Sequence, residues 1–180
     1  EKIQQTGGGT GFNFSHVNPK NDFFNPSDRT DKGPISYMKM FDLATEKVRH
    51  NGKRRGANIG ILDISHPDIE EFIASKSDKD VLNNFNISVA ISDDFMKTLE
   101  RNGDWALIHP QTQEPIKKIH ARTLWNNIIE SAWHTGDPGL IFIDTINNQN
   151  ATPLLGAIES TNPCGEVPLL PNESCNLGSV

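Results

Sequence analysis

The sequence is poor in cysteine. Its 180 residues contain only two, too few for the disulfide framework of small secreted domains. It also lacks a basic excess: 17 Lys and Arg stand against 23 Asp and Glu, so a protein that binds nucleic acid through phosphate charge alone is not expected. No stretch approaches the roughly 20 apolar residues of a membrane span, and the first residues lack the apolar segment of a signal peptide. These absences predict a soluble cytoplasmic protein that contacts neither membrane nor nucleic acid.

The sequence does contain enough apolar residues for a folded domain. Hydrophobic residues make up 35% of the chain, and the glycines bring the apolar share to about 43%, near the globular range. The length fits one domain or a part of one. Because the chain lacks an initiator Met and stops without a polar tail, we expect an internal piece of a longer protein.

Helix and strand patterns alternate along residues 1–145. Apolar residues at helical intervals predict helices over residues 34–52, 69–73, 92–103 and 124–136. Buried strands are expected over residues 57–64, 84–91 and 139–145, with a hairpin over residues 105–119. Residues 65–68 have the spacing of a capping box. The alternation predicts an α/β fold with a largely parallel sheet.

Histidine and tryptophan receive no chemical role from these patterns. We expect the histidines in helix caps or on the surface, and the tryptophans in the core: His66, His109, His120 and His134; Trp105, Trp125 and Trp133. Six dispersed histidines and two cysteines without C-x-x-C spacing provide no zinc ligand set. The Asp93–Asp94 pair fits a helix N-terminus rather than a metal site, so no metal is predicted.

Two loops are unusual in composition. Residues 6–11 (Thr-Gly-Gly-Gly-Thr-Gly) predict a tight turn into a strand, and they lack the Lys and the spacing of a phosphate-binding loop. Lys53, Arg54 and Arg55 form a basic turn, which compensation of a helix C-terminal dipole would by itself explain.

Residues 146–180 are rich in Asn, Pro, Gly and Ser and hold both cysteines, which is typical of a functional loop. Asn162, Cys164 and Glu166 are two residues apart, so an extended strand would place all three on one face. The amide could hold a hydroxyl or carbonyl group, and the carboxylate could accept a proton. The thiol could perform nucleophilic, redox or radical chemistry.

The second thiol, Cys175, lies eleven residues after Cys164. A turn near residues 168–172 could bring the two sulfur atoms together. The alternative is a structural pair of buried thiols, since free cysteine is among the most buried residue types. The spacing leaves both possibilities open.

Residues 162–166 (Asn-Pro-Cys-Gly-Glu), followed by Leu-Leu-Pro and by Glu-Ser-Cys-Asn-Leu-Gly-Ser, resemble the active-site finger of ribonucleotide reductase in its adenosylcobalamin-dependent (class II) form. Further stretches resemble the family in the same order: residues 6–15, 52–62, 66–73 and 136–144. The resemblance implies part of a ten-stranded α/β barrel made of two five-stranded halves. Residues 1–145 would belong to the first half-barrel and residues 146–180 to a central finger loop.

The resemblance also implies a role for each finger residue. Cys164 would become a thiyl radical that abstracts the 3′-hydrogen of a ribonucleoside di- or triphosphate. Glu166 would accept the 3′-hydroxyl proton, and Asn162 would hydrogen-bond the ribose hydroxyls. Cys175 would be one half of the reducing dithiol, with its partner upstream of the glycine-rich motif. Adenosylcobalamin would supply the radical in a site that excludes water.

In the family, the loop matching Lys53, Arg54 and Arg55 lies between the effector site and the substrate base, and the glycines at Gly8 and Gly9 bring backbone close to the substrate. Residues 18–32 match the specificity loop at the dimer interface, but residues 27–32 depart from the family's small-residue pattern, which leaves effector preference open. The resemblance thus implies dNTP or ATP effectors, a homodimer, and a thioredoxin-like or other dithiol reductant.

Two alternatives accompany this interpretation. One is the same reaction driven by a separate radical-generating subunit (class I type). The other is a thiol-redox or nucleotide-binding fragment without radical chemistry. In either reductase case, we expect the 180-residue piece alone to be inactive and unstable, because half a barrel has open strand edges.

Overall fold

The computed structural model describes residues 2–22, 32–50, 54–78 and 80–175. Its helices are α1 (Lys2–Gln5), α2 (Gly33–Lys47), α3 (Ile69–Ala74), α4 (Asp93–Glu100), α5 (Ala121–Thr135), α6 (Ile143–Asn148) and the 3-10 helix η1 (Pro153–Leu155). Its strands are β1 (Thr10–Asn13), β2 (Arg49–His50), β3 (Arg54–Arg55), β4 (Asn58–Asp63), β5 (Phe85–Ile91), β6 (Asp104–Ile108), β7 (Pro115–His120), β8 (Gly139–Phe142), β9 (Ser160–Thr161) and β10 (Pro168–Leu169).

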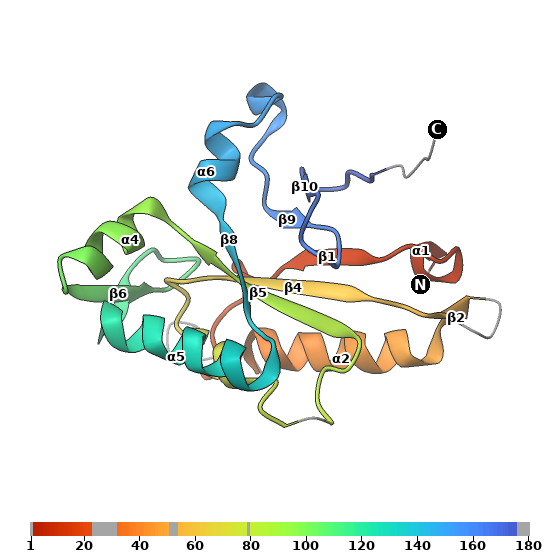
Figure 1. Ribbon diagram of the computed structural model, residues 1–180, viewed down its shortest axis with the longest axis horizontal. Coiled ribbons are helices and arrows are strands. Elements are labelled where there is room, and N and C mark those ends of the chain that lie inside the picture. Colours follow the sequence, from red (N-terminus) through yellow and green to blue (C-terminus); the bar gives the residue numbers. More distant parts are fainter. Residues whose placement is uncertain (1, 23–31, 51–53, 79, 176–180) are drawn as a thin grey trace.

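The centre of the fold is a four-stranded sheet in the order β1-β4-β5-β8. All three pairings are parallel, which confirms the predicted α/β class. In Figure 1, α2 and α5 lie below this sheet, whereas α6, β9 and β10 lie above it. The strands described here form an open wall, as expected for part of a barrel.

The hydrophobic core lies mainly between the sheet and its helices. Fully buried side chains from both layers meet there, including Met38, Phe72, Phe85 and Phe95. A smaller cluster on the opposite face of the sheet consists of Ile59, Ile61, Ala90 and Ile141, with residues of α6 packed against it. Burial on both faces explains why β4 and β5 read as nearly continuous apolar runs.

Several local predictions are confirmed. The Ser92 hydroxyl accepts a hydrogen bond from the backbone N–H of Phe95 at 3.2 Å and caps α4. Gly136 ends α5 with a φ of 85°, the left-handed conformation that favours glycine. The hairpin predicted over residues 105–119 is formed by β6 and β7.

Two element boundaries differ from the prediction. Helix α2 ends at Lys47 rather than near residue 52, because Val48 is extended and begins the short β2–β3 hairpin. At this end of α2, Thr45 is buried and the neighbouring Ala44 is exposed. Residues 143–145, expected to extend the last strand, instead begin α6.

The capping box predicted at residues 65–68 is wrong. Asp68 is the N-cap of α3 without a side-chain cap bond; its Oδ2 accepts the N–H of Lys20 at 2.8 Å. His66 is also buried, not on the surface: its Nε2 pairs with the carbonyl of Val17 at 2.9 Å, and its Nδ1 accepts the N–H of Asp68. The side chains of Asp68 and His66 therefore bind the backbone of residues 17–20 instead of capping α3.

Two further burial predictions are wrong. His109 is 1% exposed and lies 3.2 Å from Oδ1 of the equally buried Asp22, while its Nδ1 accepts N–H groups from residues 111 and 112. Trp133 was expected in the core but is 80% exposed. The physical reason is that α5 packs through Leu124 and Ile128, and Trp133 projects from another side of the helix. Within the described ranges, no helix is long and apolar enough to cross a membrane.

Candidate functional site

The segment that contains the predicted site residues is a small hairpin. Strands β9 and β10 pair antiparallel, with Thr161 opposite Pro168; we call residues 160–169 the finger hairpin. At its tip, the N–H of Gly165 donates to the carbonyl of Asn162 at 3.0 Å, and the N–H of Asn162 donates to the carbonyl of Val167 at 3.3 Å. Gly165 adopts a φ of 86°, which closes the turn at little steric cost.

This turn corrects the expected extended strand with Asn162, Cys164 and Glu166 on one face. The three residues instead share one tight loop, because Gly165 is left-handed and the Oδ1 of Asn162 accepts the N–H of Val167 at 3.0 Å. The Asn162 side chain therefore holds the loop together with its carbonyl oxygen, and its NH₂ group remains a donor. Cys164 and Glu166 are both exposed at the tip.

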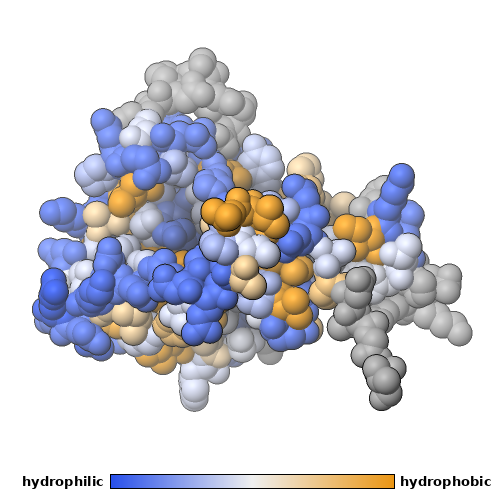
Figure 2. Space-filling view, turned by 90° about the horizontal axis from the view of Figure 1, so that it is seen from above, coloured by the Kyte–Doolittle hydropathy of each residue, from blue (hydrophilic) through white to orange (hydrophobic). Residues whose placement is uncertain are grey.

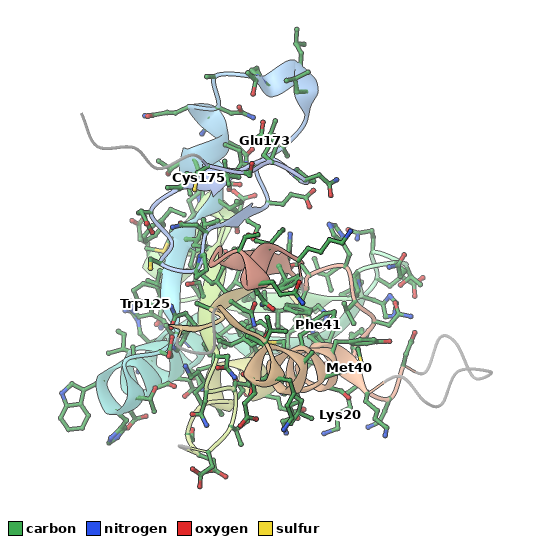
Figure 3. The ribbon with its side chains drawn as sticks, turned by 90° about the vertical axis from the view of Figure 1, so that its right-hand side faces the viewer. Lys20, Met40, Phe41, Trp125, Glu173 and Cys175 are labelled. Carbon is green, nitrogen blue, oxygen red and sulfur yellow. The ribbon has the colours of Figure 1, made fainter. Side chains whose placement is uncertain are left out.

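Both cysteines are exposed free thiols, which excludes the alternative of a buried structural pair. A turn is present where one was predicted: the N–H of Leu170 donates to Oε2 of Glu173 at 2.9 Å, and Asn172 has a positive φ of 64°. Figure 3 shows Glu173 and Cys175 on one side of the sheet and Phe41 and Met40 of α2 on the other. Cys175 thus follows the finger hairpin on the same side of the sheet.

The glycine-rich segment before β1 provides the seat for the finger hairpin. A Cβ built on Gly9 would lie 2.8 Å from Cδ of Pro163 and closer still to its Cγ. A Cβ on Gly11 would lie 2.8 Å from Oγ of Ser160 and closer to the carbonyl oxygen of Thr161. Only glycine allows the hairpin to approach the strand this closely. The predicted tight turn is therefore also a close backbone contact.

Gly8 has a different neighbour. A Cβ at this position would lie 2.8 Å from Cγ2 of Ile3, so Gly8 makes room for α1 rather than for the finger hairpin. Of the two glycines predicted to approach a ligand, Gly9 is the one beside Pro163, next to the thiol residue Cys164.

Sequence reasoning missed one residue that holds the finger hairpin. The side chain of Asn86 on β5 donates from Nδ2 to the carbonyl of Pro163 at 2.8 Å. The sequence signal for Asn86 was its position as a polar residue between Phe85 and Ile87, which are both 1% exposed. A side chain between two core residues of a strand faces the opposite side of the sheet, where the finger hairpin lies.

The basic residues lie at the amino ends of the same strands. Arg54 and Arg55 form β3, paired with β2, and Gly56 and Ala57 connect them directly to β4. The carbonyl of Ala57 accepts the N–H of Thr10 at 3.1 Å, next to Gly9. Lys53, the third member of this predicted loop, lies outside the described residues. The β2–β3 hairpin and the seat of the finger hairpin therefore share one edge of the sheet.

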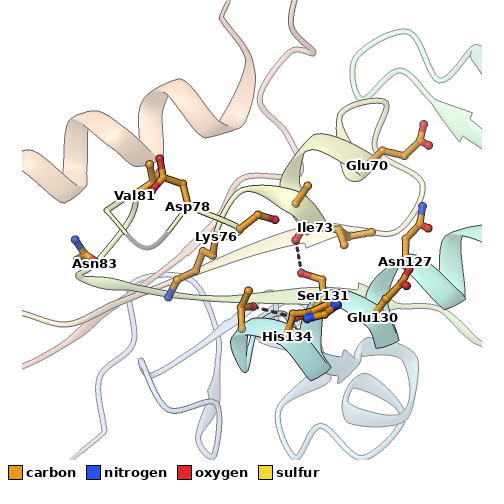
Figure 4. A pocket seen from close by; sticks show the side chains of 13 residues that line it. Glu70, Ile73, Lys76, Asp78, Val81, Asn83, Asn127, Glu130, Ser131 and His134 are labelled. Carbon is orange, nitrogen blue, oxygen red and sulfur yellow. Dashed lines mark hydrogen bonds between the residues drawn. The ribbon is translucent and has the colours of Figure 1, made fainter.

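Two hollows lie near the sheet. One, of about 450 Å³, lies beside the finger hairpin and is lined by residues of β1, α2 and the chain around it, among them Asn13, Tyr37, Phe41 and Glu159. The other, of about 700 Å³, lies on the helix side between α3 and α5 (Figure 4). Its wall is stabilised by Ser131, whose Oγ donates to the carbonyl of Ile73 at 2.9 Å. No residue of the finger hairpin lines this second hollow.

The face above the sheet carries apolar side chains at its surface. Figure 2, seen from this side, shows hydrophobic patches among hydrophilic residues. The exposed large apolar residues of the chain include Leu154 and Leu155 of η1 and Phe142 of β8. In the part of the chain that the structure describes, no group of three or more His, Cys, Asp or Glu side chains is arranged to hold a metal ion.

Comparison with known proteins gives a consistent answer along the whole chain. A family model described as "Ribonucleotide reductase, barrel domain" matches residues 1–180. The chain is 54% identical over 179 residues to a vitamin B12-dependent ribonucleoside-diphosphate reductase of Thermoplasma acidophilum, covering 99% of this chain and 23% of that protein. It is 46% identical over 180 residues to a protein of the same name from Mycobacterium tuberculosis, covering 99% and 26%.

A vitamin B12-dependent ribonucleotide reductase of Streptomyces avermitilis is 34% identical over 202 residues, covering 99% of this chain and 21% of that protein. The chain therefore spans 21–26% of the length of these three relatives.

Proposed function

Because the chain belongs to the ribonucleotide reductase barrel family, we propose that the protein containing it reduces ribonucleotides to 2′-deoxyribonucleotides, with adenosylcobalamin as the source of the radical. The observation that carries the proposal is the finger hairpin: a free, exposed Cys164 at the tip of a turn, with Glu166 two residues on and Asn162 closing the turn.

Cys164 acts on the ribose. Its thiyl radical takes the hydrogen atom from C3′, forming an S–H bond and leaving a carbon radical. The step is reversible because S–H and activated C–H bonds have similar strengths. Glu166 accepts the 3′-hydroxyl proton as a general base, which makes loss of the protonated 2′-hydroxyl as water easier. Asn162 donates from its NH₂ group to the ribose oxygens, because its Oδ1 already accepts the N–H of Val167.

Two electrons and two protons complete the reduction. Cys175 and a second thiol elsewhere in the longer protein provide them and become a disulfide, while Cys164 returns its hydrogen atom to C3′. A thioredoxin-like or other dithiol protein then reduces that disulfide. The exposed, unbonded state of Cys175 supports this role, because thiol–disulfide exchange requires an accessible sulfur.

The residues at the tip fit a bulky radical-generating cofactor. Cys164 is exposed, and no described atom lies within 4 Å of a Cβ built on Gly165, so there is open space beside the thiol. When bound, adenosylcobalamin would supply the radical that accepts the hydrogen atom from Sγ of Cys164. Cys164 and Gly165 would face it; the other residues that hold it belong to the rest of the protein. In the longer protein, the rest of the barrel would cover the tip and exclude water.

Recognition and regulation belong to the β2–β3 hairpin, which we call the basic hairpin, and to the glycine-rich residues 6–11. Lys53, Arg54 and Arg55 read the substrate base and respond to bound dNTP or ATP effectors, since guanidinium groups donate to base edges and phosphates in a directional way. Backbone at Gly8 and Gly9 approaches the substrate. The protein works as a homodimer in the cytoplasm.

The experiment is anaerobic ribonucleotide reduction by the full-length protein with a dithiol, with and without adenosylcobalamin. Cobalamin-dependent product that disappears in Cys164→Ser, while the Ser77→Ala control at an exposed position on the helix side keeps full activity, supports the proposal. Product that requires a second protein subunit transfers the radical source to that subunit. A folded protein that forms no product under any of these conditions overturns the proposal.

A further inference from the structure

A buried polar network lies beneath the amino ends of β1 and β4. Gln4 of α1, Thr45 of α2 and Asn58 of β4 are 7%, 2% and 1% exposed. Nε2 of Gln4 donates to Oδ1 of Asn58 at 2.7 Å and to Oγ1 of Thr45 at 3.1 Å. Nδ2 of Asn58 donates to the same Thr45 oxygen at 2.9 Å, and the Thr10 hydroxyl of β1 donates to Oδ1 of Asn58 at 2.6 Å.

The hydrogen bonds of this network are directional, whereas apolar contacts at the same place would not be. Oδ1 of Asn58 and Oγ1 of Thr45 each accept two hydrogen bonds, and all of these bonds join different elements of the fold. In a low-dielectric interior such bonds are strong, and they fix one geometry because a shifted partner is left unsatisfied. The network therefore sets how α1, α2, β1 and β4 lie relative to one another.

One side of the network contacts the chain that follows the basic hairpin. A Cβ built on Gly56, the residue after β3, would lie 2.7 Å from Cγ2 of Thr45 and 3.2 Å from Cδ of Gln4. Thr45 is also three residues before Val48, whose N–H donates to the Thr45 carbonyl at 3.0 Å as the chain leaves α2 for β2. The chain that enters β2 and the chain that leaves β3 therefore both adjoin residues of the network.

The other side of the network reaches the seat of the finger hairpin. Thr10, whose hydroxyl joins the network, directly follows Gly9, the residue that contacts Pro163. The Thr10 N–H is held by the carbonyl of Ala57, the residue before Asn58. The network thus contacts the end of β3 through Gly56 and reaches the seat of the finger hairpin through Thr10. Under the proposed function, the two hairpins that it joins act on one substrate molecule.

We propose that Gln4, Thr45 and Asn58 are positioning residues that fix the basic hairpin relative to the finger hairpin and so determine which ribonucleotide bases are accepted. The inference rests on the proposed function, because the base-reading role of Arg54 and Arg55 belongs to it. When C3′ of the substrate is held at Cys164, a displaced basic hairpin contacts the substrate base at a different position. Selectivity among bases is then the property that the network controls.

The test compares Thr45→Val with Thr45→Ser in the full-length enzyme. Valine keeps the shape of threonine and removes the oxygen that accepts two hydrogen bonds, whereas serine keeps that oxygen. We expect T45V to change the ratio of kcat/KM between the best and the poorest of the four ribonucleotides by roughly 3- to 10-fold, and T45S to stay near wild type. Thr98→Val is the control, because it removes a hydroxyl bond to the Asp94 carbonyl in α4.

Hydrogen exchange of the same proteins measures the coupling without any turnover. In T45V, peptides covering residues 49–58 and 160–169 are expected to exchange faster together, and in T98V neither is expected to change. If T45V lowers Tm but leaves both the selectivity ratio and these exchange rates at the wild-type values, the network is only structural and the inference is wrong. If T45V does not fold, Gln4→Met removes the amide at similar length and takes its place.

The outcomes separate this inference from the function on which it rests. If the wild-type enzyme reduces no ribonucleotide, the proposed function fails, and the exchange data still decide whether the network couples the two hairpins. If reduction occurs and T45V is as selective as wild type, with unchanged exchange in both peptides, the function stands and the inference fails.

Discussion

The two faces of the parallel sheet are built by different means. On the helix side, large side chains such as Phe72, Phe85 and Phe95 are fully buried against one another. On the other side, the finger hairpin sits on two glycines and one hydrogen bond from Asn86, and both cysteines remain exposed. Close packing stabilises the first face, while the second carries two exposed thiols. Substitutions on the helix side should therefore change stability, and substitutions on the finger side should change activity.

The strongest test of this division is Glu166→Gln. Loss of the general base is expected to lower kcat by roughly 100- to 10,000-fold, with Tm near wild type because glutamine keeps the size and shape of the glutamate side chain. Anaerobic turnover and thermal melting of the full-length enzyme check both halves of this prediction. The exposed Glu114→Gln on the β6–β7 turn serves as the charge-matched control. A large fall in Tm with E166Q would break the comparison.

Phe95→Ala is the corresponding change on the helix side. Phe95 is fully buried and its ring meets that of Trp105 edge-on at a centroid distance of 5.3 Å. Truncation should lower the free energy of unfolding by about 3–5 kcal/mol, through lost burial and the cavity left behind. Denaturant unfolding measures this loss. At a temperature where the variant remains folded, kcat should be close to wild type; a large drop there would show that the two faces are not separable.

Gly8 and Gly9, which precede β1, test the role of the finger side within a single turn. In Gly9→Ala the added methyl group meets the Pro163 ring and displaces the finger hairpin, whereas in Gly8→Ala it meets Cγ2 of Ile3 in α1 and leaves the finger hairpin in place. We expect G9A to lose roughly 10- to 100-fold in kcat, because small displacements of a reacting group are costly. G8A should lose much less. Equal losses in kcat for the two variants would contradict the inference that Gly9 positions the finger hairpin.

The smallest expected effect is a pH dependence on the helix side. Burial lowers the pKa of His66 below its ordinary value of 6.5, against the opposing effects of the Val17 carbonyl and Asp63, while nearby His109 lowers it further. Since the unfolded chain binds a proton that the folded chain resists, stability is fully present above pH 6.5 and declines as the pH falls below it. The slope is at most about 1.4 kcal/mol per pH unit for one proton.

Unfolding free energies of the full-length protein between pH 5 and pH 8, compared with those of His66→Gln, check this prediction. Glutamine should flatten the dependence. A wild-type profile that rises as the pH falls would mean that the direction assigned to the His66 pKa is wrong.

The sequence alone predicted the elements whose signals are local. The helix start at residue 92, the helix end at residue 136 and the strand over residues 84–91 each depend on residues within one turn or one strand of each other. The motif around Cys164, together with the four further stretches in the same order, also identified the family correctly. These features are determined by neighbours along the chain and needed no knowledge of the fold.

Other features were decided only by tertiary structure, because they depend on contacts between distant segments. The buried positions of His66 and His109 depend on the chain around residues 17–22, and that of Thr45 on Gln4 and Asn58. The contact between Gly9 and Pro163 joins residues 154 positions apart (163 − 9), which no local pattern encodes. The sequence by itself determined which candidate groups the finger hairpin carries; the tertiary structure decided how they are held, because hydrogen bonds and close packing form only between segments that the fold brings together.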